Sequence, residues 1–166
     1  TLYKTDGAVA SQNNVIVNNT IIQATDGRDA VSLSSGAINN KLYNNIIVQQ
    51  NTSTLRGCIS IDRASQTGFV SDYNVFAGNI RFSTDGKKYI VGLPAWQSAM
   101  GQDSHSLTST LTALFVNAAG NDYHLKAGSP AINTGTSTYA PSIDLSGNSR
   151  PIGAGFDIGC YEYLLG

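Results

Sequence analysis

The chain carries little charge, and this excludes two classes of partner. Lys, Arg, Asp and Glu make up 13% of its 166 residues, against roughly 25% in a typical soluble domain. Ten basic and eleven acidic residues give a net charge of -1. The sequence therefore offers no basic field for a nucleic acid backbone or for an anionic membrane. Asn, Ser, Thr, Gly and Tyr take the place of charge, a composition typical both of sugar-binding proteins and of inert β proteins.

Long apolar runs and paired cysteines are also missing. No stretch approaches the roughly 20 apolar residues of a membrane-spanning helix, so we expect no membrane insertion. The only cysteines, Cys58 and Cys160, match no metal-binding spacing. Both lie in apolar, strand-like stretches, and we predict two separate buried thiols in preference to a disulfide.

Two Asn-Asn pairs repeat at a fixed distance along the chain. The pairs at 13–14 and 18–19 recur at 39–40 and 44–45, which is 26 residues later in each case. Chance rarely places four such dipeptides in one register. A repeat of this length predicts a solenoid, in which each turn of chain stacks on the turn before it.

A six-residue frame, apolar-x-x-Asn-x-apolar, joins residues 16–21, 42–47 and, with Ser in its first position, 71–76. Stacked strands lie about 4.8 Å apart, so equivalent residues form columns in which Asn side chains hydrogen-bond from turn to turn. Asn also favours turns, but that preference explains the residue type and not the register. We therefore predict an asparagine ladder that consists of Asn19, Asn45 and Asn74.

A second strand repeats with a different offset. Residues 31–33 (VSL) and 59–61 (ISI) lie 28 residues apart, and their alternation points the apolar side chains into a shared core. The two additional residues fall in the loop at 49–57, where a solenoid tolerates insertions. The sequence thus predicts an all-β chain, a single-stranded parallel β-helix that winds about once every 26–29 residues.

The regular repeat fades towards the C-terminus. We assign residues 1–89 to about three β-helix rungs and residues 90–166 to an irregular cap of the same domain. Pro near the start and Gly after the end predict a short helix at 93–100, and 157–163 is predicted as the last core strand. Residues 1–7 are typical of the interior of a protein, so we expect missing upstream rungs or another chain at the N-terminal edge.

Several motifs follow one another in a characteristic order. Residues 71–76 (SDYNVF) come first, and the later landmarks are WQ at 96–97, GQDSHS at 101–106, FVN at 115–117, DYHL at 122–125, GSPAINTG at 128–135, GNSRP at 147–151 and DIGCYE at 157–162. As a set they resemble secreted bacterial proteins of the pectate-lyase-like superfamily, over nearly the whole chain. Cys160, where Ala is expected, and 113–114, where Asp-Pro is usual, depart from the pattern. The resemblance implies a right-handed parallel β-helix and a secreted or cell-surface location.

The resemblance also implies a class of chemistry. Relatives include polysaccharide lyases, hydrolases, epimerases and surface proteins. The lyases cleave uronic acid polymers by β-elimination: a basic residue accepts the proton while Ca²⁺ or Arg neutralises the carboxylate. We therefore predict a carbohydrate-active module that binds or cleaves acidic polysaccharide. The alternative is a non-catalytic surface adhesin or a self-assembling structural solenoid, which the low charge and the lack of an established lyase motif favour.

Charged loop residues beside the repeated strand are the candidate substrate-binding residues. They are Asp26, Arg28, Asp29, Arg56, Asp62 and Arg63. The 28-residue offset places the first two arginines of this set in one column, and arginine forks match planar carboxylates. An interpretation as ordinary solvated loop charges stays open.

The sequence assigns no catalytic residue and contains no evident cofactor motif. Ca²⁺ is the ion that the resemblance implies, with Asp26 or Asp29 as its carboxylate ligand. The histidines, His105 and His124, lack a third ligand at metal spacing, so we interpret both as structural.

Overall fold

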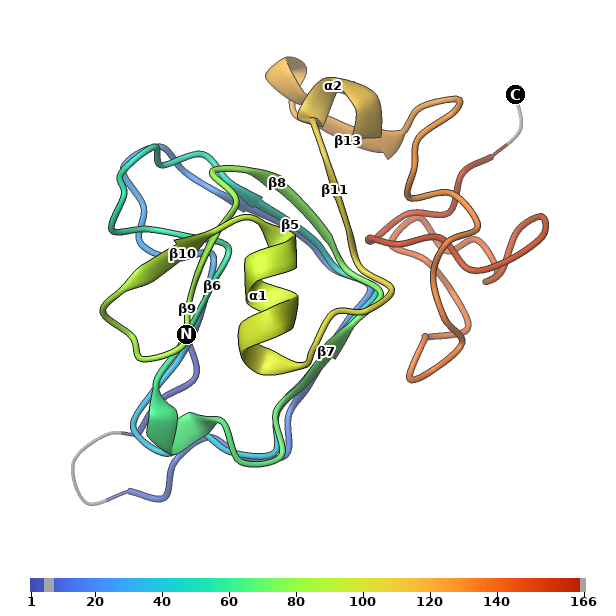
Figure 1. The fold of residues 1–166 in the computed structure, drawn as a ribbon. Helices are drawn as coiled ribbons and strands as arrows, with labels where there is room; N and C mark the ends of the chain where they lie inside the picture. Colours follow the sequence, from blue (N-terminus) through green and yellow to red (C-terminus); the bar gives the residue numbers. More distant parts are fainter. Residues whose placement is uncertain (5–7, 165–166) are drawn as a thin grey trace.

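A computed structural model describes residues 1–4 and 8–164 as an all-β chain with few helices. Three sheets surround an interior, and strands from successive turns of the chain overlie one another (Figure 1). The first sheet contains β1 (Val15–Val17), β4 (Lys41–Tyr43) and β7 (Val70–Asp72). The second contains β3 (Val31–Leu33), β6 (Ile59–Ile61), β9 (Arg81–Ser83) and β10 (Tyr89–Val91). The third contains β2 (Thr20–Gln23), β5 (Ile46–Gln49), β8 (Val75–Gly78) and β11 (Leu107–Ser109).

The strands pair in the register that the repeat predicts. Ile16 lies opposite Leu42, and Leu42 opposite Ser71, in parallel strands. In the third sheet Ile21, Ile47 and Phe76 lie in one column, and Val31 pairs with Ile59. The alignment of the repeated segments is therefore confirmed.

The second sheet is mixed, which departs from a purely parallel arrangement. Strand β10 runs antiparallel to β9, because a tight turn reverses the chain between them. Asp85 forms this turn by accepting hydrogen bonds from the backbone N–H groups of Lys87 and Lys88, both at 2.8 Å. The hairpin ends the succession of parallel strands in this sheet.

The remaining elements follow β10. They are α1 (Leu93–Met100), α2 (Leu111–Leu114), β12 (Phe115–Asn117), a 3-10 turn η2 (Ala118–Gly120) and β13 (Asp122–Leu125), while η1 (Arg63–Ser65) lies earlier, between β6 and β7. Strands β12 and β13 form an antiparallel hairpin.

Helix α1 covers the end of the interior that faces away from the N-terminal turn, and it lies across the ring of strands in Figure 1. The interior packs side chains such as Leu42, Ile59 and Phe76. Trp96 of α1 stacks on Phe82 with ring centroids 4.9 Å apart. The predicted helix at 93–100 is confirmed, and it ends at Gly101 in the left-handed conformation.

The segment after β11 packs beside the third sheet (Figure 1), so the predicted cap at 90–166 divides into two parts. Ile46 and Val48 point outward from β5 and pack with Leu114 and Ile158 in a second core. Gly159 approaches β5 so closely that a Cβ at this position would lie 2.7 Å from the Cδ1 of Ile46. All four residues of β5 are consequently buried. The uninterrupted apolar run at 46–48 is typical of a strand that is covered on both faces.

The asparagine ladder runs up one corner of the stack. Asn45 Oδ1 accepts hydrogen bonds from the backbone N–H and the Nδ2 of Asn19, at 3.0 and 3.2 Å. Asn74 Oδ1 accepts the same two bonds from Asn45, at 2.9 and 3.1 Å. Each carboxamide oxygen thus bonds the residue one turn closer to the N-terminus.

The backbone explains why asparagines come in pairs. The residue before each ladder position has a left-handed conformation: Asn18, Asn44 and Tyr73 have φ angles of 52°, 53° and 56°. Asn tolerates this conformation better than most residues because its short side chain bonds locally. The first Asn of a pair therefore turns the corner, and the second supplies the ladder amide.

The ladder position tests the importance of these amides for stability. Replacing Asn45 with Leu leaves buried partners on both neighbouring turns without hydrogen bonds, so we expect the free energy of unfolding to fall by about 1–3 kcal/mol. Asn19→Leu is the matched control, because Asn19 is exposed and lies at the end of the ladder. Urea unfolding measures both, and equal losses would contradict this account.

Candidate functional site

The candidate charged residues fall into two groups at opposite ends of the second sheet's strands. Asp26, Arg28 and Asp29 precede β3 and Arg56 precedes β6, whereas Asp62 and Arg63 follow β6. The structure therefore does not gather the six residues into one cluster.

Arg28 and Arg56 lie on neighbouring turns. The backbone N–H of Ala30 donates to the carbonyl of Gly57, and Val31 pairs with Ile59, so the offset of 28 residues extends back to the arginines. Arg28 is exposed and Arg56 is half-buried. Arg56 Nη1 bonds the carbonyl of its neighbour Leu55 at 2.9 Å. Among the residues that the structure describes, neither arginine forms an ion pair.

Asp29 lies beside the arginines but is bound to other groups. Its Oδ1 accepts hydrogen bonds from the backbone N–H of Gly57 at 2.9 Å and from the Tyr89 hydroxyl at 2.7 Å. Burial, and then this hydrogen bond, raise the pKa of Tyr89. Tyr89 comes from the β9–β10 hairpin, and no repeat in the sequence connects it with Asp29. Sequence reasoning missed it for that reason.

Asp62 has a structural role. Its carboxylate accepts from the backbone N–H of Ser65 at 2.9 Å, which caps η1, and from that of Ser35 on the preceding turn at 2.7 Å. Arg63 and Asp26 are exposed.

The carboxylates before β3 do not fit a Ca²⁺ site. Within residues 1–4 and 8–164 no group of three or more His, Cys, Asp or Glu side chains is placed to hold a metal ion. Asp29 Oδ1 is already bonded to two donors. A hard cation that needs six to eight oxygen ligands would depend almost wholly on water or substrate here.

Each histidine forms the same arrangement with an aspartate and a tyrosine. His105 Nδ1 lies 2.8 Å from Asp72 Oδ2, and its ring stacks on Tyr73 at 4.7 Å. His124 Nδ1 lies 2.7 Å from Asp122 Oδ1, and its ring stacks on Tyr161 at 4.0 Å. The hydrogen bonds from His124 lower the pKa of Asp122. The Asp-x-His spacing on β13 signals the second pair, but only the fold brings Asp72 to His105.

The two cysteines are separate thiols, as expected. Cys58 is buried in the interior, and desolvation raises the pKa of its thiol to about 12. Cys160 is half-buried, and desolvation raises its pKa as well. Both thiols are therefore protonated at neutral pH, and neither is activated as a nucleophile.

The described hollows lie away from the arginines. An apolar cavity of about 290 Å³ in the C-terminal segment is lined by residues that include Ile132, Ile152 and Tyr163. A second, of about 340 Å³, lies beside Gln49 and Asn79 at the ends of β5 and β8. The arginine column is thus an open surface and not a pocket.

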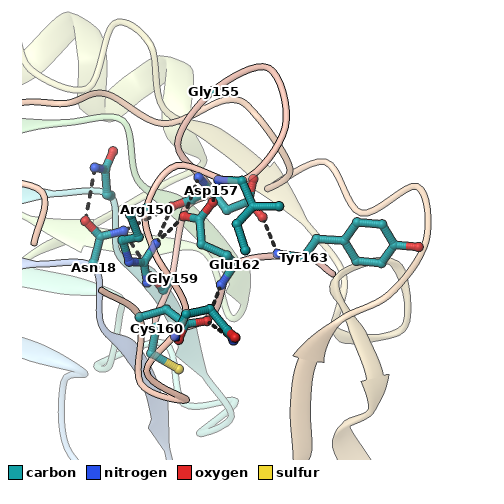
Figure 2. A network of polar contacts seen from close by, with 12 residues as sticks. Asn18, Arg150, Gly155, Asp157, Gly159, Cys160, Glu162 and Tyr163 are labelled. Carbon is teal, nitrogen blue, oxygen red and sulfur yellow. Dashed lines mark hydrogen bonds and ion pairs between the residues drawn. The ribbon is translucent and has the colours of Figure 1, made fainter. Parts of the chain in front are cut away.

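A buried ion pair fastens the C-terminal segment (Figure 2). Arg150 Nη1 lies 2.7 Å from Glu162 Oε1, with the two side chains 1% and 0% exposed. Arg150 Nη2 donates to the carbonyl of Gly159 at 2.8 Å. The carboxylates of Asp157 and Glu162 accept from backbone N–H groups, including those of Tyr163 and Ile152.

These side chains replace a sheet ladder. Residues 157–163, predicted as the last core strand, contain no regular strand. The sequence pattern was apolar enough for a strand, but carboxylates satisfy the backbone N–H groups that a neighbouring strand would otherwise bond. Asn18 connects this segment to the stack, because its Nδ2 donates to the carbonyls of Asp157 and Gly159 at 3.0 and 3.2 Å.

Comparisons with family models, with curated proteins and with solved structures found no match to this chain. In the part of the chain that the structure describes, no helix is long and apolar enough to cross a membrane.

The ion pair gives a prediction about stability. Arg150→Met leaves the Glu162 carboxylate buried without its cation, so we expect the free energy of unfolding to fall by about 3–5 kcal/mol. Arg150→Met/Glu162→Gln removes the unpaired charge and keeps an acceptor for the backbone. We expect the double variant to be more stable than the single one in chemical denaturation, and the opposite order would exclude a stabilising charge pair.

Proposed function

We propose that this chain is the C-terminal part of a secreted, right-handed parallel β-helix protein of the pectate-lyase-like superfamily, and that it binds an acidic polysaccharide. The parallel pairing of strands from successive turns, such as Thr20 with Ile46 and Ile46 with Val75, supports the β-helix. The order of the C-terminal sequence motifs supports the superfamily, a bacterial origin and a secreted or cell-surface location.

The binding proposal depends on one observation: Arg28 and Arg56 lie on neighbouring turns without an acidic partner among the described residues. Neighbouring strands are about 4.8 Å apart, so the two guanidinium groups share one patch of surface. Like charges at such a distance repel each other, and an anion between them removes the repulsion. A uronate or sulfate chain that lies across the turns would offer planar or tetrahedral oxygens to both arginine forks.

The chemistry beside the arginines favours binding over cleavage. β-Elimination requires a group that accepts a proton from the substrate. Tyr89 holds its proton at neutral pH, because burial and the hydrogen bond to Asp29 raise its pKa. Asp29 in turn accepts that hydroxyl and a backbone N–H. These two groups therefore act as a support for the surface and not as a base.

Titration with oligogalacturonate tests the proposal. We expect Arg28→Ala/Arg56→Ala to weaken binding by at least about tenfold, because each lost guanidinium removes charge-assisted hydrogen bonds to a carboxylate. The matched control is Lys41→Ala/Lys126→Ala, which removes the same total charge from other surfaces and should leave the affinity nearly unchanged. Calorimetry measures all three proteins, and added NaCl should weaken binding.

Two further measurements separate the alternatives. Ultraviolet absorbance of an unsaturated uronate product during incubation with pectate, alginate or chondroitin would show cleavage and overturn a binding-only role. Equal affinities for the wild type and the arginine variant, or no binding of any of the three polymers, would overturn polysaccharide recognition by this surface. The latter result would leave a structural solenoid or an adhesin for another ligand.

A further inference from the structure

Two asparagine ladders end on unbonded acceptors at the N-terminal side of the stack. Asn40 Oδ1 accepts from the N–H and Nδ2 of Asn14, at 3.0 and 2.8 Å, just as Asn45 Oδ1 does from Asn19. Each oxygen therefore bonds donors from the preceding turn. The corresponding oxygens of Asn14 and Asn19 receive no hydrogen bond from any residue among 1–4 and 8–164.

The opposite end of the ladder is closed by the chain itself. The backbone N–H of Asn74 donates to Ser106 Oγ at 2.8 Å, and its Nδ2 donates to Asp103 Oδ1 at 3.1 Å. Asp103 also accepts from Trp96 Nε1 at 2.7 Å, so the helix that covers the interior takes part in the closure. The two ends of the stack thus differ: one has its own terminating residues and the other presents free acceptors.

The strands next to Asn14 and Asn19 show the same incompleteness. The strand β2 is half-exposed along its whole length, whereas its neighbour β5 is buried throughout, and Val15 of β1 is 41% exposed. Asn14 and Asn19 carbonyls accept from Lys41 and Ile46. Because backbone groups alternate along a parallel strand, Val15 and Thr20 direct theirs to the opposite, unpaired edge.

The edge of β3 is the exception. Leu2 donates its N–H to the carbonyl of Ser32 at 2.7 Å, and its carbonyl accepts from Ser34 at 2.9 Å. The chain's own N-terminal residue thus occupies β3, and the open surface is limited to β1 and β2. We call this surface, with the oxygens of Asn14 and Asn19, the N-terminal edge.

A second copy of the chain does not match the N-terminal edge. Paired with the same edge of a copy, the oxygens of Asn14 and Asn19 would face acceptors like themselves. Paired with the other end, they would meet a surface that α1 and Ser106 already close. What fits is a segment that offers amide donors at the five-residue spacing of these two asparagines.

We propose that the N-terminal edge binds a polypeptide rung of the same repeat, which runs parallel to β1 and β2 and donates from two asparagines five residues apart. The proposal rests on the stacked β-helix put forward above. It names a donor pattern, Asn-x-x-x-x-Asn between apolar strands, that identifies the partner segment.

A labelled peptide with the sequence of residues 11–23 provides the probe, since it contains both asparagines and both strands. We expect saturable binding to the whole chain by fluorescence anisotropy. Val15→Pro in the protein removes an N–H that points out of β1 and should weaken binding by about tenfold or more. Thr108→Pro is the matched control, because Thr108 is exposed on β11 at the opposite end of the stack, and it should bind as the wild type does.

Asn→Asp at both asparagine positions of the peptide replaces the side-chain donors with carboxylates, and this should also weaken binding by about tenfold. No saturable binding, equal binding of a scrambled peptide, or equal effects of Val15→Pro and Thr108→Pro would overturn the proposal. So would a concentration-dependent dimer in light scattering that Val15→Pro dissolves, because that outcome identifies a second copy as the partner. Loss of oligogalacturonate binding in the arginine variant is independent of all these results.

Discussion

The hydrogen bond from an asparagine backbone N–H to the asparagine oxygen of the next turn is the interaction on which the stack depends. A corner between two parallel strands leaves backbone groups directed along the stack, and buried groups of this kind must find partners. Asn45 is fully buried and bonds both neighbouring turns. The pairing with a left-handed Asn before it makes each corner a two-residue unit. The register of all three sheets follows from these corners.

Burial on both faces distinguishes the third sheet from the other two. Its inner side chains, such as Ile47, join the interior, while Ile46 and Val48 contact the C-terminal segment. That segment contains little regular structure after β13, and the Arg150–Glu162 pair with its surrounding carboxylates satisfies its backbone. The polar network and the second core therefore depend on each other, because the network orients Ile158 and the core keeps water from the ion pair.

The charged surface illustrates how the fold sorts residues of one type. Asp29 and Asp62 bond backbone N–H groups on neighbouring turns, and so they stabilise the stacking directly. Arg28 and Arg56 have no such anionic partner among the described residues. The solenoid thus takes up its acidic groups and leaves its basic groups facing solvent, which makes a nearly neutral chain locally cationic.

The sequence by itself determined the strands, their register and the ladder, because stacking turns repeat the same local chemistry at Asn19, Asn45 and Asn74. It also determined the short helix, since Pro94 and Gly101 act locally. Only the tertiary structure decided where the C-terminal segment packs, that β10 reverses direction, and that Tyr89 meets Asp29 and His105 meets Asp72. These contacts join residues that no repeat relates. A repeat fixes neighbours one turn away, whereas the position of a non-repeating segment depends on the whole surface that it buries.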